Sequence, residues 1–360
     1  MFDTDKSTAK VEESSASETL NLLIHLLILV LSFAIILAGS EMFTNGVEWA
    51  GQRLKISEAA VGSLLAAVGT ALPETFIPAV ALLSGPKDYA AHSAVGVGAI
   101  MGAPLMLSTL ALFVMGIAAI GFRQRRARIA MRVPPEHVRR DLGWFIPIFL
   151  LLTALGLLNL GLVARRAAAV GLLLAYVGYS VMMLRLKRAE GIELEHGLYF
   201  ERILRGNPLA PRLRVTLVQV ICGVIAILIG ANAFVEQIVL FSHRANINPG
   251  VLSLILSPLA TELPEKYNSV VWIRRGKDHL ALANITGAMV FQSCIPVALG
   301  LAFSPWHLTP PELLAGAVGL VSSTILFINV RDGELGTPTL MIGGIAYAIF
   351  LTGLALLGLF

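Results

Sequence analysis

The chain alternates long apolar stretches with short polar segments. Each stretch has about 20 residues or more, the length that an α-helix needs to cross a bilayer. Strands of a membrane barrel would instead alternate polar and apolar residues, and unpaired backbone amides cannot face lipid. The pattern therefore predicts an all-α integral membrane protein with ten transmembrane helices. We place them at residues 20–50, 57–83, 90–121, 144–162, 167–184, 215–241, 249–273, 279–303, 311–330 and 339–360.

Composition and charge agree with a membrane environment. Apolar residues make up 56% of the chain and charged residues 14%, whereas a soluble domain has about 25% charged residues. The isoelectric point of 9.2 does not indicate a nucleic-acid partner, because the basic residues lie in short loops between the apolar stretches. Cys222 and Cys294 lie inside apolar stretches, so no disulfide is expected.

The distribution of the basic residues predicts the topology. Most of the 27 Lys and Arg residues fall in alternate loops, which we assign to the cytoplasmic side. Both termini are then outside, and we expect the protein in the cell membrane. Residues 1–19 are polar and acidic and lack a basic segment before a short apolar core, so we expect a disordered tail rather than a signal peptide.

A sequence repeat divides the chain into two halves. GTALPE at residues 69–74 and ATELPE at 260–265 both lie within apolar stretches, and the same spacing also pairs Gly39 with Gly230. Five predicted spans separate the two copies, and an odd number means that they enter the membrane from opposite faces. We expect a first five-helix repeat at 20–184, a charged cytoplasmic linker at 185–214 and a second five-helix repeat at 215–360.

The repeated motifs carry the chemistry. A carboxylate in the middle of a membrane helix costs roughly 2.5–3.5 kcal/mol, yet Glu74 and Glu265 occupy matching positions. Pro73 and Pro264 each lack an amide proton and so leave a backbone carbonyl of the preceding turn unpaired. Carboxylates, carbonyls and hydroxyls suit hard cations such as Ca²⁺ and Na⁺. We therefore predict a cation site near the middle of the membrane, with no cofactor.

Glu262 has no counterpart in the first motif, where Ala71 stands. It is either a third ligand or a proton-binding group, since a buried acid near two others titrates closer to neutral pH. Alternatively, Lys266 at the i+4 position neutralises it, although the break at Pro264 is expected to weaken that pairing. Two amides eight residues apart, Asn284 and Gln292, share one face of the span at 279–303 and either coordinate the ion or join helices.

The two motifs resemble the α-repeats of the sodium/calcium exchanger (calcium/cation antiporter) superfamily, over roughly residues 39–107 and 230–299. The resemblance implies that Glu74 and Glu265 bind Ca²⁺ and Na⁺ alternately, assisted by Thr70 and Thr261. Gln292 falls where the family has a further ion-binding side chain, and Asn284 matches the asparagine of a downstream family motif. Ala71 and Glu262 replace the family's serine, and most polar groups of the sodium sites are absent.

We expect a secondary active cation antiporter that exchanges Ca²⁺ or a related cation for Na⁺ or H⁺ by alternating access. The resemblance implies that the spans at 20–50 and 215–241 slide against the core, and we expect a monomer to be functional. Alternatives are a proton-coupled exchanger or a Na⁺/H⁺ antiporter with Glu262 as proton carrier, and a passive channel. No metal-hydrolase or paired catalytic motif indicates an enzyme. The coupling ion and the stoichiometry stay open.

Overall fold

A computed structural model of the chain describes residues 4–53, 72–83, 88–123, 130–186, 197–330 and 333–358, without the side chains of residues 4–18, 52, 72, 184, 186 and 260. The described regular structure is helical apart from one short pair of strands, β1 and β2. The first half contains α1 (Thr4–Arg53), α4 (Leu72–Leu83), α5 (Tyr89–Met106), the π-helical η2 (Leu107–Ala111), α6 (Leu112–Gly121), β1 (Met131–Arg132), α8 (Pro135–Leu155) and α9 (Leu162–Leu186). There follow α10 (Tyr199–Ile203), α11 (Leu213–Ala245), α12 (Pro249–Thr261), α13 (Leu263–Arg274), α14 (Asp278–Phe303), α15 (Pro310–Asn329), β2 (Glu334–Leu335) and α16 (Thr337–Leu356).

The helices match most of the predicted spans. Seven helices of the described part are long and apolar enough to cross a membrane, which supports an α-helical membrane protein. The predicted span at 57–83 lies largely outside the described residues, and α4 covers its end. The span at 249–273 consists of two short helices, α12 and α13, and the span at 144–162 corresponds to α8, which ends at Leu155. The count of ten spans stays a prediction.

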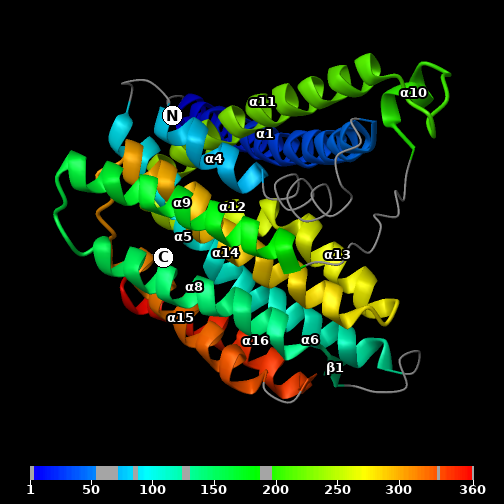
Figure 1. Cartoon of the computed structure of the whole chain (residues 1–360). Coiled ribbons are helices and arrows are strands. Elements are labelled where there is room, and N and C mark those ends of the chain that lie inside the picture. The colour runs from blue at the N-terminus through cyan, green and yellow to red at the C-terminus, as the bar shows by residue number, and fades with distance from the viewer. Residues whose placement is uncertain are drawn as a thin grey trace.

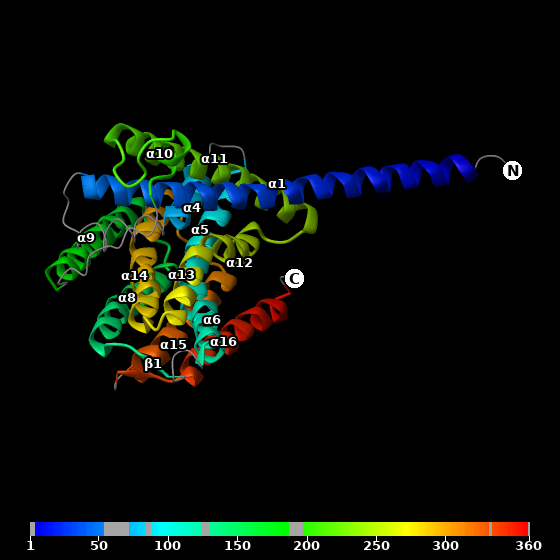
Figure 2. The same cartoon turned by 90° about the vertical axis from the view of Figure 1, so that its right-hand side faces the viewer.

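The N-terminal segment differs from the expectation of a disordered tail at residues 1–19. Helix α1 begins at Thr4 and continues without interruption to Arg53. From Thr4 to Thr19 the segment contains no Gly or Pro, the residues that most strongly oppose a helix. No residue there is therefore expected to interrupt α1. Figure 2 shows this helix running past the rest of the molecule toward the N-terminus.

Helices α1 and α11 lie side by side along one edge of the molecule, opposite α15 and α16 (Figures 1 and 2). They run antiparallel, because Gly46 lies against Val220 whereas Ile36, earlier in α1, lies against Gly230. A β-carbon at Gly46 would lie 2.8 Å from the Val220 side chain, too close for the present packing. The small residues therefore let the two helices approach closely, as is common in membranes.

The contacts of this pair are related by the spacing that separates Glu74 from Glu265. A β-carbon at Gly39 would lie 2.9 Å from the carbonyl oxygen of Gly223, and one at Gly230 would lie 2.9 Å from that of Ser32. By this spacing, Gly39 corresponds to Gly230 and Ser32 corresponds to Gly223. The two close contacts therefore occur at equivalent positions of the two halves. By the same spacing, the first and last residues of α4 correspond to the first and last residues of α13. These correspondences agree with the predicted repeat, whose inverted arrangement stays a prediction.

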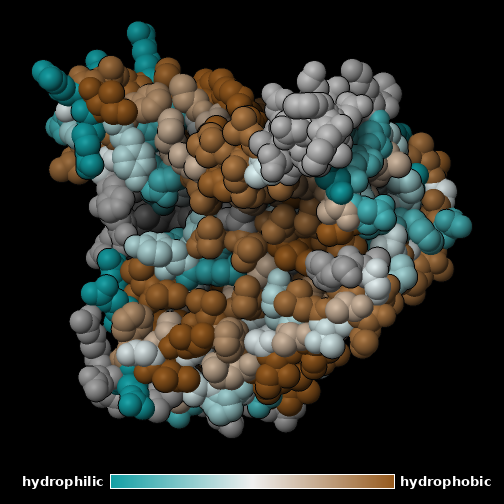
Figure 3. All heavy atoms as spheres, turned by 180° about the vertical axis from the view of Figure 1, so that it is seen from behind, coloured by the Kyte–Doolittle hydropathy of each residue, from teal (hydrophilic) through white to brown (hydrophobic). Residues whose placement is uncertain are grey.

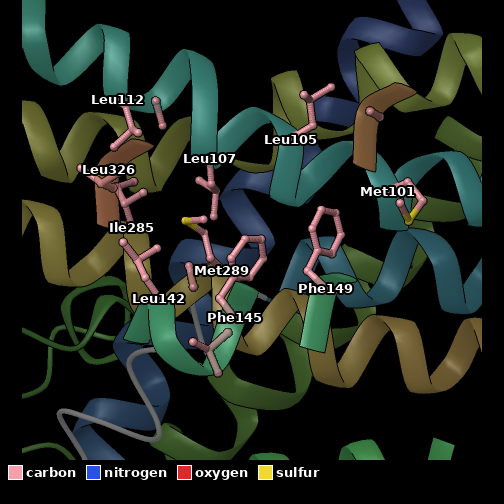
Figure 4. Close-up of a cluster of buried hydrophobic side chains, with 14 of the residues drawn as sticks. Met101, Leu105, Leu107, Leu112, Leu142, Phe145, Phe149, Ile285, Met289 and Leu326 are labelled. Atoms are coloured by element: carbon pink, nitrogen blue, oxygen red, sulfur yellow. The ribbon is translucent and has the colours of Figure 1, made fainter. Parts of the chain in front are cut away.

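The apolar core lies between the inner helices, in the region of Figure 4. Phe145 and Phe149 of α8 stack with ring centroids 4.9 Å apart. They belong to a buried cluster with side chains from α5, η2, α6, α14 and α15. The labelled members in Figure 4 are Met101, Leu105, Leu107, Leu112, Leu142, Phe145, Phe149, Ile285, Met289 and Leu326. This cluster makes the inner helices one packed body.

Apolar side chains also cover the outside. Leu174 of α9 is 66% exposed, Ile229 of α11 is 59% exposed and Ile345 of α16 is 61% exposed. Figure 3 shows such hydrophobic residues spread broadly over one face of the molecule, with hydrophilic residues mainly toward its margins. An exposed apolar surface of this kind indicates contact with lipid. The molecule is therefore an integral membrane protein.

Candidate functional site

Both motif glutamates stand in the first turn of a short helix. Helix α13 begins at Leu263 with Pro264 in its first turn, and Glu265 follows directly. Proline is tolerated at this position because the first amides of a helix have no partner within the helix. Pro73 and Glu74 take the corresponding positions in α4. Helix α12 ends at Thr261, so its C-terminal carbonyl oxygens lie next to the start of α13.

The structure brings these acids from the two halves together. Glu74, Glu262 and Glu265 are all buried, with 4% or less of each residue exposed. Among the charges that act on Glu74, that of Glu265 is the strongest, followed by those of Glu262 and Lys266. Residues far apart in the sequence therefore form one charged cluster inside an apolar body.

Three of the cluster's side chains, Glu74, Gln292 and Glu262, have buried polar atoms without a hydrogen-bond partner among the described residues; in Glu262 this atom is Oε1. Within the described residues, neither carboxyl oxygen of Glu74 has a hydrogen-bond partner. The Gln292 side-chain amide lies close to the Glu262 carboxyl group. Neither the nitrogen nor the oxygen of this amide has a hydrogen-bond partner of suitable geometry among the described residues. Buried polar groups are nearly always satisfied, so these atoms are open to a partner other than the described side chains.

Glu262 forms an ion pair with Lys266. The Lys266 Nζ donates to Glu262 Oε2 at 3.2 Å, and both side chains are buried. The expectation that Pro264 weakens this pairing was wrong. The Lys266 amide still donates to the Glu262 carbonyl at 3.1 Å, because Glu262 is the N-cap of α13 and the helical turn between the two residues is intact.

The remaining candidates differ in their positions. The Asn284 amide of α14 donates to the Glu265 carbonyl at 3.4 Å, which ties α14 to the second motif. Thr261 is buried, and its hydroxyl donates to the Ser257 carbonyl at 3.1 Å within α12. Thr70 lies outside the described residues. The structure thus places Asn284, Gln292 and Thr261 next to the motif acids or in the same helix turn.

No ready-made metal site is present in this part of the chain: no three His, Cys, Asp or Glu side chains of the described residues come close enough together to hold an ion. A cation at Glu74 and Glu265 would therefore need neutral oxygens as further ligands. Hydroxyl, amide and carbonyl oxygens near the motif acids have the right chemistry for a hard cation.

Sequence reasoning missed two residues near this region. Tyr347 of α16 lies within electrostatic range of Glu262. Asp141 of α8 is buried behind α14 and accepts hydrogen bonds from Thr286 and Tyr179 at 2.6 and 2.9 Å. Neither residue belongs to a repeated motif. The sequence does carry a signal for Asp141, because this acidic residue lies directly before an apolar stretch, where a charge is costly.

Comparison with known proteins identifies the family. A family model described as "Sodium/calcium exchanger protein" matches residues 24–185 and 215–358, which is more than half of the chain. The chain belongs to the sodium/calcium exchanger family. A curated relative in the family, the "Putative antiporter CaxA" of Alkalimonas amylolytica, is 22% identical over 317 residues, covering 87% of this chain and 92% of the relative.

Solved structures share the fold of this exchanger-family chain. The crystal structure of the "H+/Ca2+ Exchanger CAX" matches with a TM-score of 0.72 at 15% identity, covering 98% of this chain and 93% of that protein. The "sodium-calcium exchanger NCX_Mj" matches with a TM-score of 0.57 at 20% identity, covering 92% of this chain and 98% of that protein. At these identities the likeness shows the fold. Membership of the exchanger family makes the chain a transmembrane ion transporter.

Proposed function

We propose that the chain is a secondary active antiporter that exchanges Ca²⁺ for Na⁺ or H⁺ by alternating access at Glu74 and Glu265. One observation carries the proposal. Two buried carboxylates from corresponding positions of the two halves act on each other inside an apolar body. Buried like charges repel, so a pair of this kind calls for a cation between them.

The groups around the two acids favour a hard cation. Carboxylate, hydroxyl, amide and backbone oxygens are the ligands that Ca²⁺ and Na⁺ prefer. Glu74 and Glu265 bind the ion, and Thr70, Thr261, Asn284 and Gln292 supply neutral ligands. Family relatives named as a putative antiporter, an H⁺/Ca²⁺ exchanger and a sodium-calcium exchanger support Ca²⁺ as the transported ion and H⁺ or Na⁺ as the coupling ion.

Movement of α1 and α11 together opens the site to each side in turn. The two helices pack closely through glycines along one edge of the molecule, and Ile77 and Ala81 of α4 belong to their apolar cluster. Glu265 of α13 instead accepts a hydrogen bond at its carbonyl from Asn284 of α14. We place the protein in the cell membrane as a monomer with both termini outside. Alternating access requires the coupling ion and Ca²⁺ to use the same site at different times.

The test is gradient-driven flux of radiolabelled Ca²⁺ into proteoliposomes, with an imposed Na⁺ or pH gradient. Glu74→Gln and Glu265→Gln each remove one carboxylate from the site. We expect each to reduce flux on the order of 100-fold or more, because even residues that only support metal ligands contribute 10- to 100-fold.

Glu312→Gln is the matched control. Glu312 is equally buried but caps α15, where it accepts a hydrogen bond from the Thr309 amide at 2.7 Å. The glutamine carbonyl keeps that hydrogen bond, so flux should persist. Wild-type flux from both Glu74→Gln and Glu265→Gln would refute the proposed site, and Ca²⁺ uptake that needs no counter-ion gradient would indicate a passive channel.

A further inference from the structure

A lysine lies inside the cluster of acids. Lys266 is 7% exposed and its ammonium lies 3.2 Å from Glu262 Oε2. Its charge is among those that act on Glu74 in the opposite half of the molecule. A buried lysine is costly unless it is paired, and it has three hydrogen-bond donors and no acceptor. The positive charge of Lys266 therefore contributes to the net charge of the whole cluster of acids, and not only to that of Glu262.

The formal charges can be counted. Glu262 and Lys266 form an ion pair at 3.2 Å, and these two residues and Glu265 lie within electrostatic range of Glu74. Together with Glu74 they make three carboxylates and one ammonium. With all groups ionised, the cluster has two negative charges more than positive ones. This excess equals the charge of one divalent cation or of two monovalent cations.

We infer that Lys266 is a tethered counter-cation that neutralises Glu262 and so matches the charge of the site to one divalent ion. This inference rests on the proposed transport of Ca²⁺ at Glu74 and Glu265. Glu262 then acts through Lys266 and is not a Ca²⁺ ligand. An ammonium fixed to the helix takes the place of a monovalent cation that a third free carboxylate would otherwise require.

The geometry separates Glu262 from a simple ligand. Glu262 Oε2 accepts a hydrogen bond from the Lys266 ammonium, so a Ca²⁺ ion at that oxygen would have to displace a positive charge. Glu262 Oε1 has no hydrogen-bond partner among the described residues, but an ion bound there would still lie next to the same ammonium. The pair lies within one helical turn, in which the Lys266 amide also donates to the Glu262 carbonyl. No residue of the first motif corresponds to either charge, since Ala71 and Thr75 occupy the matching positions. The second half adds both charges together, and the pair is neutral.

Charge-compensating variants test this inference, with Ca²⁺ as the probe. Glu262→Gln alone leaves a buried, unpaired ammonium beside Glu265 and Glu74. We expect its apparent Ca²⁺ affinity to fall at least about tenfold, since a unit charge several ångström away has at least this effect at an effective dielectric constant near 20. Lys266→Met alone adds net negative charge, so its apparent Ca²⁺ affinity should rise.

The double variant Glu262→Gln/Lys266→Met is the decisive comparison. It removes both charges and restores the original balance, so we expect it to recover Ca²⁺ affinity and gradient-driven flux to well above those of Glu262→Gln. The interaction between the two substitutions is then far from additive, as expected for residues in contact. Lys266→Arg, which keeps the charge, should retain more flux than Lys266→Met.

Two measurements keep the outcomes distinct. The first is the Ca²⁺-dependent rise of the melting temperature of the purified protein, which needs no transport. The second is flux in proteoliposomes. A folded double variant that binds and transports Ca²⁺ as poorly as Glu262→Gln would overturn the inference, because Glu262 itself would then be needed as ligand or proton carrier.

A second double variant, Glu262→Gln/Lys266→Gln, removes the same two charges and provides the same test should the first fail to fold. The proposed function fails in a different way, through absence of counter-ion-driven Ca²⁺ flux in the wild-type protein. The inference fails only if wild-type flux is present and charge compensation does not restore it.

Discussion

Asp141 is a buried carboxylate that joins three helices. It accepts hydrogen bonds from Thr286 of α14 at 2.6 Å and from Tyr179 of α9 at 2.9 Å. Thr286 lies two residues after Asn284, on the opposite face of α14. Asp141 therefore holds α14 from behind, and α14 carries the two amides of the site.

We predict that Thr286→Val destabilises the protein by about 1.5–3 kcal/mol, the usual contribution of a hydrogen bond to a charged group. Valine has nearly the shape of threonine, so the change removes the donor with little change in packing. Thermal or denaturant unfolding in detergent measures the effect.

Thr352→Val is the matched control for this prediction. The Thr352 hydroxyl donates only to a backbone carbonyl of its own exposed helix face, so its loss should have little effect. Equal stability of Thr286→Val and the control would show that Asp141 does not need this hydrogen bond.

The sequence predicted some of these residues and not others, for physical reasons. Glu74 and Glu265 could be found because a carboxylate in an apolar stretch is costly and both occur in a repeated motif. Pairing of Lys266 with Glu262 was one of three alternatives, beside a third ligand and a proton-binding group, because the effect of Pro264 on the turn could not be settled from spacing. Asp141 was missed since its two partners are distant in sequence and belong to no motif.

Helices α1 and α11 form a pair that is joined by side-chain hydrogen bonds. Gln219 of α11 donates to Asn45 of α1 at 2.9 Å, and Tyr199 of α10 donates to Glu41 of α1 at 2.6 Å. A different contact links α11 to α5. His243 Nε2 of α11 lies 2.8 Å from Oδ2 of Asp88, the residue before α5. If α1 and α11 slide together, the Asp88 contact must change while the contacts within the pair persist.

This difference predicts the outcome of crosslinking. Cysteines at positions 88 and 243, joined by a short thiol crosslinker in a Cys222→Ser background, should stop Ca²⁺ flux because α11 is then fixed to α5. Cleavage of a reducible crosslinker should restore flux. Transport is measured in proteoliposomes before and after reduction.

Cysteines at positions 25 and 237 provide the control. His25 of α1 and Gln237 of α11 are hydrogen-bonded at 2.9 Å, so a crosslink there stays within the pair. It should leave flux largely intact. Undiminished flux with positions 88 and 243 fully crosslinked would rule out sliding of α11 past α5.

At the scale of elements, apolar length predicted where helices lie better than where they break. The stretch at 249–273 was predicted as one span, but Glu262 has φ −90° and ψ 9° and separates α12 from α13. Pro264 explains the position of this break. The predicted tail at 1–19 is helical from Thr4 onward, because its polar composition says little about helix formation when Gly and Pro are absent.

For the whole molecule, the sequence predicted the family and the α-helical membrane fold. The motifs alone pointed to the exchanger family, and the family model and the fold of the solved structures agree. The packing of α1 on α11 and the meeting of Glu74 with Glu262 and Lys266 needed the structure, because they depend on contacts between distant segments.

The central claim is that one Ca²⁺ ion lies between Glu74 and Glu265. The most direct test is a crystal structure of the protein in Ca²⁺, or in Sr²⁺ for its anomalous signal. We predict a peak within about 2.3–2.6 Å of carboxyl oxygens from both residues, the usual Ca²⁺–oxygen distance. A peak that contacts neither carboxylate, or only one of them, would contradict this claim.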